Sequence, residues 1–326
     1  MRRISRYHTM IRMLLSYWQK NLVLKYNPFR LWIEITNVCN LSCIMCLNKS
    51  IKTEERGFME IELFKKIINE AKAFVSSVNL HHRGEPLLHE DLPKMIEYCR
   101  EHGIYSQLHT NAALLTEDKA YEIITSGLDF ISFSFDGFDK STYENIRVGA
   151  NFENTLGNIT NFLRIKNELK SKIPYSVVEV IGSLRNSISG YEKIRNNLLS
   201  LKLDKFIIKQ AHNWGGEYEQ ESNTSLSCKE KSICYPCTFP WYALVVFWDG
   251  TVVPCPQDFF GENRFGDLKI NSLKEIWNNS ALIEFRKQMK ERKYQELKPC
   301  MLCDRLHRSH FLGIPTSHLR PFIKES

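Results

Sequence analysis

The sequence lacks an apolar run long enough to cross a membrane, and it has no acidic residue before Glu34. A spanning helix needs about 20 consecutive apolar residues, so we expect no transmembrane segment. The first 30 residues also lack an apolar core followed by small residues at a cleavage site, which argues against a secretory signal. No base-reading motif accompanies the basic residues, so nucleic acid is not an expected partner.

The missing acids leave the N-terminal segment strongly basic. The first 30 residues hold seven Lys and Arg, and the remaining 37 basic residues equal the 37 acidic ones in number. Apolar residues recur here at spacings of three and four, which predicts a basic amphipathic helix within residues 1–28. Two uses remain open for this helix. It could meet an anionic membrane surface or substrate carrier, or it could dock its aromatic face on the main domain.

Ten cysteines in 326 residues are grouped in threes and pairs, which indicates metal binding in a reducing compartment and hence the cytoplasm. Cys39, Cys43 and Cys46 follow the apolar run 31–35, which predicts a buried strand. Three thiolates in one short loop can hold one metal centre, because closing a short loop costs little entropy. A closed zinc site or a fully ligated iron–sulfur cluster takes four protein ligands, so a set of three predicts an open position.

A second group of cysteines lies beyond residue 227: Cys228, Cys234, Cys237, Cys255, Cys300 and Cys303. Asp249-Gly250 predicts a β-hairpin that brings Cys237 and Cys255 together, and a helix over 272–290 leads back to Cys300 and Cys303. These four thiols predict a closed site, for which zinc and [4Fe–4S] both remain open. Cys234 is an alternative to Cys237 as a ligand. Cys99, on the apolar face of a predicted helix, is expected in the core.

Between residues 31 and 210, segments with strand patterns alternate with segments of helical periodicity. The predicted strands are 31–35, 77–81, 105–110, 130–135, 175–181 and 206–210, and the predicted helices are 60–74, 91–103, 116–127, 152–169 and 191–201. This alternation predicts βαβ units and a parallel sheet. Six units are too few for a closed eight-stranded barrel.

The spacing Cys-x3-Cys-x2-Cys after a strand resembles the cluster loop of the radical S-adenosylmethionine enzymes. In that family the three cysteines hold a [4Fe–4S] cluster whose fourth iron binds the amino and carboxylate groups of S-adenosylmethionine. The resemblance implies an α/β fold with a partial (β/α)6 TIM-like barrel over residues 29–225. The basic N-terminal helix (1–28) would precede it, and a small C-terminal α+β auxiliary-cluster domain (226–326) would follow.

The resemblance also implies a set of cofactor-binding residues. Gly84-Glu85-Pro86 is similar to the family's Gly-Gly-Glu-Pro element, with Arg83 replacing the first glycine, and Glu85 would then bind the methionyl ammonium. Ser134 and Asp136 match positions that contact the cofactor's ribose. Asn111 lies at a turn similar to the family's Thr-Asn-Gly, with Ala112 replacing the glycine.

Further polar residues follow the predicted strands, at the edge where parallel barrels gather their chemistry. His81, His82 and Arg83 are candidates for substrate contact, although a single histidine is more often structural. Candidates for substrate or adenine contact beyond strands five and six are Arg185, Gln210, His212 and Asn213.

The pattern Cys-x12-Gly-x4-Cys followed by Cys-x2-Cys resembles the auxiliary-cluster domain called SPASM, in its shortened "twitch" form with one extra cluster. The resemblance implies that Cys237, Cys255, Cys300 and Cys303 bind a second [4Fe–4S] cluster. Such a fully ligated cluster has no position for the cofactor, so it would accept an electron from the substrate radical.

The implied activity is that of a radical S-adenosylmethionine oxidoreductase. A flavodoxin- or ferredoxin-type protein would supply one electron, the cofactor would split to a 5′-deoxyadenosyl radical, and this radical would take a hydrogen atom. We expect oxidation of a carbinol carbon in a sugar- or aminocyclitol-like molecule. Alternatives are a peptide-modifying maturase, a redox-neutral epimerase with Cys228 or Cys234 as hydrogen donor, and a non-enzymatic zinc module on an inactive barrel.

Overall fold

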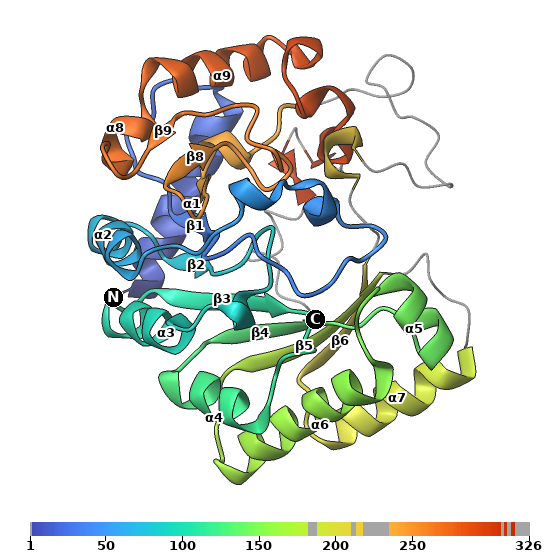
Figure 1. Cartoon of the computed structure of the whole chain (residues 1–326). Helices are drawn as coiled ribbons and strands as arrows, with labels where there is room; N and C mark the ends of the chain where they lie inside the picture. The colour runs from blue at the N-terminus through green and yellow to red at the C-terminus, as the bar shows by residue number, and fades with distance from the viewer. Residues whose placement is uncertain are drawn as a thin grey trace.

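The structure is a computed structural model that describes residues 2–181, 188–209, 213–217, 235–307, 310–311 and 314–316. Its main sheet contains six parallel strands from the first two thirds of the chain (Figure 1). They are β1 (Arg30–Ile33), β2 (Ser77–Asn79), β3 (Tyr105–Thr110), β4 (Phe130–Ser134), β5 (Tyr175–Ile181) and β6 (Lys205–Lys209). Neighbours along the chain pair in order, which confirms the predicted βαβ units and partial (β/α)6 barrel.

Helices cover the outer face of these strands (Figure 1). They are α2 (Ile61–Ala71), α3 (Leu92–Glu101), α4 (Glu117–Ser126), α6 (Phe152–Glu168) and α7 (Ile188–Ser200). Each turns an apolar stripe to the sheet, as Phe64 and Ile67 of α2 illustrate by their complete burial. A short helix, α5 (Lys140–Ile146), was not predicted. Its N-cap is Asp139, whose carboxylate accepts a hydrogen bond from Thr142 N at 2.9 Å.

The predicted hairpin is confirmed, and it extends the barrel sheet. Strand β7 (Ala243–Val246) pairs antiparallel with β8 (Thr251–Val253), which pairs with β9 (Gly266–Asp267). In addition, β7 runs parallel to β1, with Leu244 beside Leu31. The sheet therefore runs across the domain boundary expected at residue 226, and one cluster of buried side chains serves both regions. A small separate pair is formed by β10 (His310–Phe311) and β11 (Ile314–Pro315).

The prediction of a single helix over 272–290 is wrong, because the chain forms two helices there. These are α8 (Leu273–Trp277) and α9 (Ser280–Lys290). Asn278 leaves the helical conformation and uses its side-chain amide to bond both Leu24 N (3.0 Å) and Leu24 O (2.9 Å). Asn279 then caps α9 by accepting from Leu282 N at 2.9 Å. Binding the N-terminal segment thus interrupts the helix.

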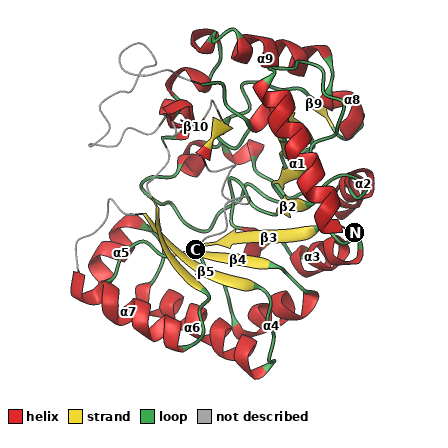
Figure 2. Cartoon of the chain, turned by 180° about the vertical axis from the view of Figure 1, so that it is seen from behind, coloured by secondary structure: helices red, strands yellow, loops and turns green. Residues whose placement is uncertain are grey.

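The N-terminal helix, α1 (Arg2–Trp18), ends ten residues before the expected limit of its segment. Its inner face docks on the molecule through fully buried Met13 and Tyr17, which supports docking for that side of the helix, whereas Trp18 of the expected aromatic face is 63% exposed. Tyr17 donates a hydrogen bond to Pro236 O at 2.6 Å and meets Trp241 edge-on at 5.5 Å. Figure 2 shows α1 on the outside of the molecule. Within the described part of the chain, no helix is long and apolar enough to cross a membrane.

Candidate functional site

The loop after β1 brings Cys39, Cys43 and Cys46 together. Asn37 closes its base, donating through its side chain to Glu55 O at 2.8 Å and accepting from Gly57 N at 2.9 Å. Burial, with smaller contributions from the nearby Glu85, Cys46 and Cys43, outweighs a backbone hydrogen bond from Leu41 and raises the pKa of Cys39 to about 11. Burial also raises the pKa of Cys46. Buried thiols this close together form thiolates readily only beside a compensating positive centre.

This donor set fits a cluster with three protein ligands. Within the described residues, no three His, Cys, Asp or Glu side chains are arranged to hold a single metal ion. In a [4Fe–4S] cluster the thiolates bind separate iron atoms instead of converging on one ion. The trio would leave one iron of such a cluster without a protein ligand, and this ligation stays a prediction.

Glu85 is buried beside this loop and belongs to the turn after β2. Its Oε1 accepts from Leu87 N (3.1 Å) and Thr110 Oγ1 (2.7 Å), and its Oε2 accepts from Asn111 N (2.8 Å). A carboxylate has about four acceptor sites, so one remains on Oε2. Burial raises the pKa of Glu85. Binding of a cofactor ammonium at that remaining site stays a prediction.

Gly84 has no side chain, which lets this turn pack closely against the cysteine loop. A Cβ at this position would lie 2.5 Å from the carbonyl oxygens of both Thr36 and Val38, so only glycine fits. Asn111 makes a second link, because its Nδ2 donates to Asn40 Oδ1 at 2.9 Å. The structure thus brings Glu85 and Asn111 to the cluster loop. Direct contact of Asn111 with the cofactor stays a prediction.

Asp136 is fully buried and its carboxylate is already engaged by the chain. Its Oδ1 accepts from Ile181 N at 2.7 Å, and its Oδ2 accepts from Nε (2.9 Å) and Nη2 of Arg147. The Nη1 atom of Arg147 lies 3.8 Å from Cys43 Sγ. Asp136 therefore holds a guanidinium next to the first cysteine set, and its expected ribose contact stays a prediction. Arg147 itself was missed, because nothing in its local sequence marks it.

Ser134, the last residue of β4, is half-buried and pairs in register with Glu179 of β5. Its place at the carboxyl end of a strand is the one expected for a cofactor contact, and that contact stays a prediction.

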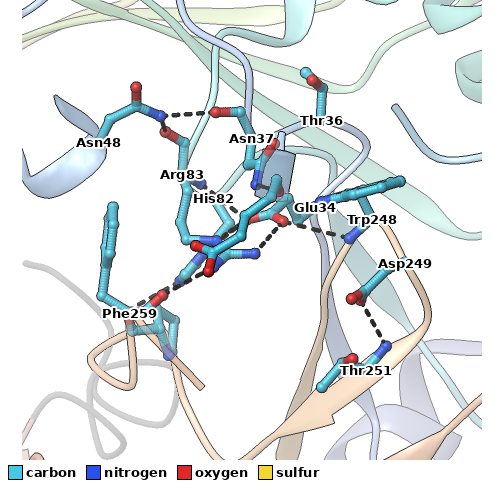
Figure 3. A network of polar contacts seen from close by, with 12 residues as sticks. Glu34, Thr36, Asn37, Asn48, His82, Arg83, Trp248, Asp249, Thr251 and Phe259 are labelled. Carbon is cyan, nitrogen blue, oxygen red and sulfur yellow. Dashed lines mark hydrogen bonds and ion pairs between the residues drawn. The ribbon is translucent and has the colours of Figure 1, made fainter. Parts of the chain in front are cut away.

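A buried ionic network centred on Glu34 was also missed (Figure 3). Arg83 donates from Nε to Glu34 Oε2 (2.6 Å) and from Nη2 to Oε1 (2.7 Å), and His82 Nδ1 lies 3.2 Å from Oε2. Burial would raise the pKa of Glu34, but the hydrogen bonds from Arg83 and His82 outweigh it and lower the pKa to about 2. His82 and Arg83 are thus bound within the protein. The idea that they meet substrate is corrected, because their polar atoms are used here.

This network joins the first cysteine loop to the second cysteine set. His82 Nε2 lies 3.0 Å from Pro256 O, and Arg83 Nη1 donates to Phe259 O at 3.1 Å, in the segment that follows Cys255. Asn48, two residues after Cys46, donates to Arg83 O at 2.6 Å. Arg83, which stands where the family has glycine, therefore ties both cysteine regions together.

The second set places Cys237, Cys255, Cys300 and Cys303 close enough for their charges to interact. Burial first, and then the Cys237 thiol and Asp258, raise the pKa of Cys255 to about 12. Burial first, and then the neighbouring thiols, Cys255 foremost, raise the pKa values of Cys300 and Cys303. Four thiols, three of them buried and Cys237 half-buried, are the donor set of a fully ligated cluster. Their ligation of iron stays a prediction.

The remaining candidates of the second half fall in two groups. Asn213, expected at substrate or adenine, instead donates to Leu302 O at 2.6 Å and accepts from Asp304 N at 3.3 Å, so it supports the second cysteine set. This correction follows from its two partners, which are the residues on either side of Cys303. The others lie outside the described residues: Arg185, Gln210, His212, Cys228 and Cys234.

Polar side chains line the carboxyl end of the sheet. The rings of His81 and His109 lie 4.2 Å apart, and His81 Nδ1 accepts from His109 N at 3.2 Å. Glu179 Oε2 lies 3.8 Å from His109 Nδ1, and Lys209 Nζ lies 2.6 Å from Glu179 Oε1. Burial lowers the pKa of His109 to about 4, so its ring is neutral at neutral pH. Cys99 is fully buried, as expected.

Comparison with known proteins identifies the two cysteine regions. The sequence model of the radical SAM superfamily matches residues 33–175, and that of the SPASM iron–sulfur cluster-binding domain matches residues 237–304. A relative from Pyrococcus furiosus, the tungsten-containing aldehyde ferredoxin oxidoreductase cofactor-modifying protein, is 25% identical in an alignment of length 317 that covers 84% of this chain and 87% of the relative.

Two solved structures share the fold. BtrN in complex with AdoMet and 2-DOIA aligns with a TM-score of 0.57 at 20% identity, over 85% of this chain and 92% of BtrN. Streptococcus suis SuiB bound to its precursor peptide SuiA aligns with a TM-score of 0.65 at 15% identity, over 83% of this chain and 69% of SuiB.

Proposed function

Because the chain belongs to the radical SAM superfamily and carries a SPASM iron–sulfur cluster-binding domain, we propose that it oxidises a carbinol carbon of a sugar- or aminocyclitol-like substrate to a ketone. This oxidation removes a hydrogen atom from carbon, a proton from oxygen and one electron. When bound, S-adenosylmethionine with a first [4Fe–4S] cluster supplies the hydrogen-atom acceptor, and a second [4Fe–4S] cluster supplies the electron acceptor. Cys39, Cys43 and Cys46 would hold the first cluster.

The observation that carries this proposal is the gathering of four thiols: Cys255, Cys300 and Cys303, which are buried, and Cys237, which is half-buried. Four cysteines fill every ligand position of a [4Fe–4S] cluster, which leaves none for cofactor or substrate. Electron transfer is then the chemistry that such a cluster can contribute. The Glu34 network supports this role, because it fixes the segment after Cys255 against the turn that carries Glu85.

The polar lining of the sheet supports a polar small molecule as substrate. His109 of β3, Glu179 of β5 and Lys209 of β6 bring hydrogen-bond donors and acceptors together on neighbouring strands, which suits hydroxyl or amino groups. BtrN was crystallised with 2-DOIA, and the Pyrococcus relative is named for modifying a cofactor. A peptide is the second candidate substrate, because SuiB, whose structure holds a precursor peptide, aligns with the higher TM-score.

Isotope transfer tests the proposal. The anaerobically reconstituted, reduced protein is incubated with S-adenosylmethionine and sugar or aminocyclitol alcohols that carry deuterium at the carbinol carbon. We expect deuterium in 5′-deoxyadenosine and a ketone product by mass spectrometry. Deuterium transfer from labelled peptides alone would replace the sugar-like substrate with a peptide. Transfer without any net oxidation would favour epimerisation.

The variant Cys300→Ala separates the two cysteine sets in the same assay. It should still form 5′-deoxyadenosine, because Cys39, Cys43 and Cys46 are unchanged, but it should lose ketone formation. The matched control is Cys99→Ala, which removes a thiol from the apolar core and should keep both products. Ketone formation at the normal rate by Cys300→Ala would contradict the electron-acceptor role.

A further inference from the structure

Helix α1 has a second apolar face that its docking on the molecule leaves uncovered. Ile11, Leu15 and Trp18 are 46%, 52% and 63% exposed. Their spacing of four and three residues places them along one stripe of the helix, away from the buried Met13 and Tyr17. Val23, just beyond the helix, is 60% exposed. The buried inner face accounts for the docking of α1 on the molecule, but it does not account for the exposed apolar side chains of the outer stripe.

The segment that carries this stripe contains basic residues and no acids. Arg12 and Lys25 are exposed, and the first two turns of the same helix contain Arg2, Arg3 and Arg6. No acid precedes Glu34, so the formal net charge of +7 arises in this segment. An exposed apolar stripe in a segment that has cations and no acids has the character of a helix that lies in the interface of an anionic membrane. Trp18 suits this place, because an indole ring favours the headgroup boundary.

We propose that the outer face of α1, formed by Ile11, Leu15 and Trp18 with Arg12 and Lys25, binds the protein to the surface of an anionic phospholipid bilayer. The charge of the segment favours this occupant over a second copy of the chain, whose identical basic face would repel it. The helix would lie parallel to the surface, because its inner side remains docked on Trp241. The site of chemistry is not involved, so the proposal is independent of the substrate.

Flotation with vesicles tests the proposal on the full-length, cluster-loaded protein. The vesicles are phosphatidylcholine alone or phosphatidylcholine mixed with phosphatidylglycerol. We expect binding to the mixed vesicles, weaker binding to the neutral ones, and release at high salt because screening weakens the attraction. The double variant Leu15→Ser/Trp18→Ser should lower partitioning at least about tenfold, since it removes the inserted apolar groups. Arg12→Glu should lower it roughly tenfold at low salt.

The matched control is Ile270→Ser, which removes an 82% exposed apolar side chain elsewhere on the surface and should bind vesicles like the wild type. Equal iron content and circular dichroism in all variants will show that they fold. Wild-type protein that stays with the soluble fraction at low salt, or equal flotation of the wild type and Leu15→Ser/Trp18→Ser, would overturn the proposal. So would a wild-type dimer in sedimentation that Leu15→Ser/Trp18→Ser abolishes, because a second copy would then cover the face.

Discussion

Replacing Arg83 by methionine tests whether the buried network holds the two cysteine regions together. Glu34 is completely buried, and Arg83 grips both of its oxygens at 2.6 and 2.7 Å. These bonds and that of His82 lower the pKa of Glu34 from 4.5 to about 2 in spite of burial. A pKa lowered by this much means that the folded protein stabilises the ionised carboxylate over the protonated form by about 3 kcal/mol. This agrees with the roughly 3–5 kcal/mol lost when one partner of a buried pair is removed.

The variant Arg83→Met should therefore unfold about 5–10 °C below the wild type, measured anaerobically by circular dichroism on the cluster-loaded protein. The double variant Glu34→Gln/Arg83→Met should lose less than the two single variants summed, because the uncompensated charge is gone. Glu62→Gln is the matched control. It breaks an exposed ion pair with Lys65 at 2.8 Å and should leave the midpoint unchanged.

A functional readout distinguishes positioning from stability alone. Arg83 also bonds Phe259 O, near Cys255, so its loss should lower the ratio of ketone to 5′-deoxyadenosine even well below the unfolding temperature. A midpoint within about 1 °C of the wild type would refute the energetic reasoning. An unchanged product ratio would refute the positioning role.

Three further outcomes follow from the structure. In a urea titration, Gly84→Ala should destabilise the protein by about 1–3 kcal/mol, because its Cβ would meet two carbonyl oxygens of the cysteine loop, and it should also lower the iron content. The control is Gly157→Ala on α6, whose Cβ would have nothing within 4 Å. It should stabilise the protein by up to about 1 kcal/mol. Iron analysis should give about eight atoms per chain for the wild type and about four for Cys300→Ala, and a zinc-loaded, colourless wild type would contradict this. Product analysis of Cys228→Ala and Cys234→Ala should show full activity in both, and loss of an epimerised product in either would restore the hydrogen-donor alternative.

The alternation of strands and helices was predictable because each element carries its own apolar period and turn signals. Local pattern also places the three cysteines of the first loop, since they directly follow a buried strand. Helix α5 was not predicted, because its seven residues are too few to show a helical period, although Asp139 and Thr142 form a recognisable N-cap. The break between α8 and α9 depends on Leu24, which lies 254 residues from its partner Asn278.

The polar network was harder to predict, because its partners come from distant segments. Glu34 interrupts the apolar run 31–35, and an acid within a buried strand requires a partner. That signal was present, but it does not say that Arg83 and His82 provide the partner. In the same way, the family pattern marks Asp136 and not the Arg147 that it holds beside Cys43. The pairing of β7 with β1 likewise depends on tertiary packing between strands some 200 residues apart.

The most direct test of the account is the formation of 5′-deoxyadenosine from S-adenosylmethionine by the reduced, anaerobically reconstituted protein. Liquid chromatography with mass spectrometry should detect it with the wild type and not with Cys43→Ala, which removes one of the three thiols that leave an iron open. A wild-type protein loaded with iron that forms no 5′-deoxyadenosine would contradict the central claim. So would a Cys43→Ala variant that forms it at the wild-type rate.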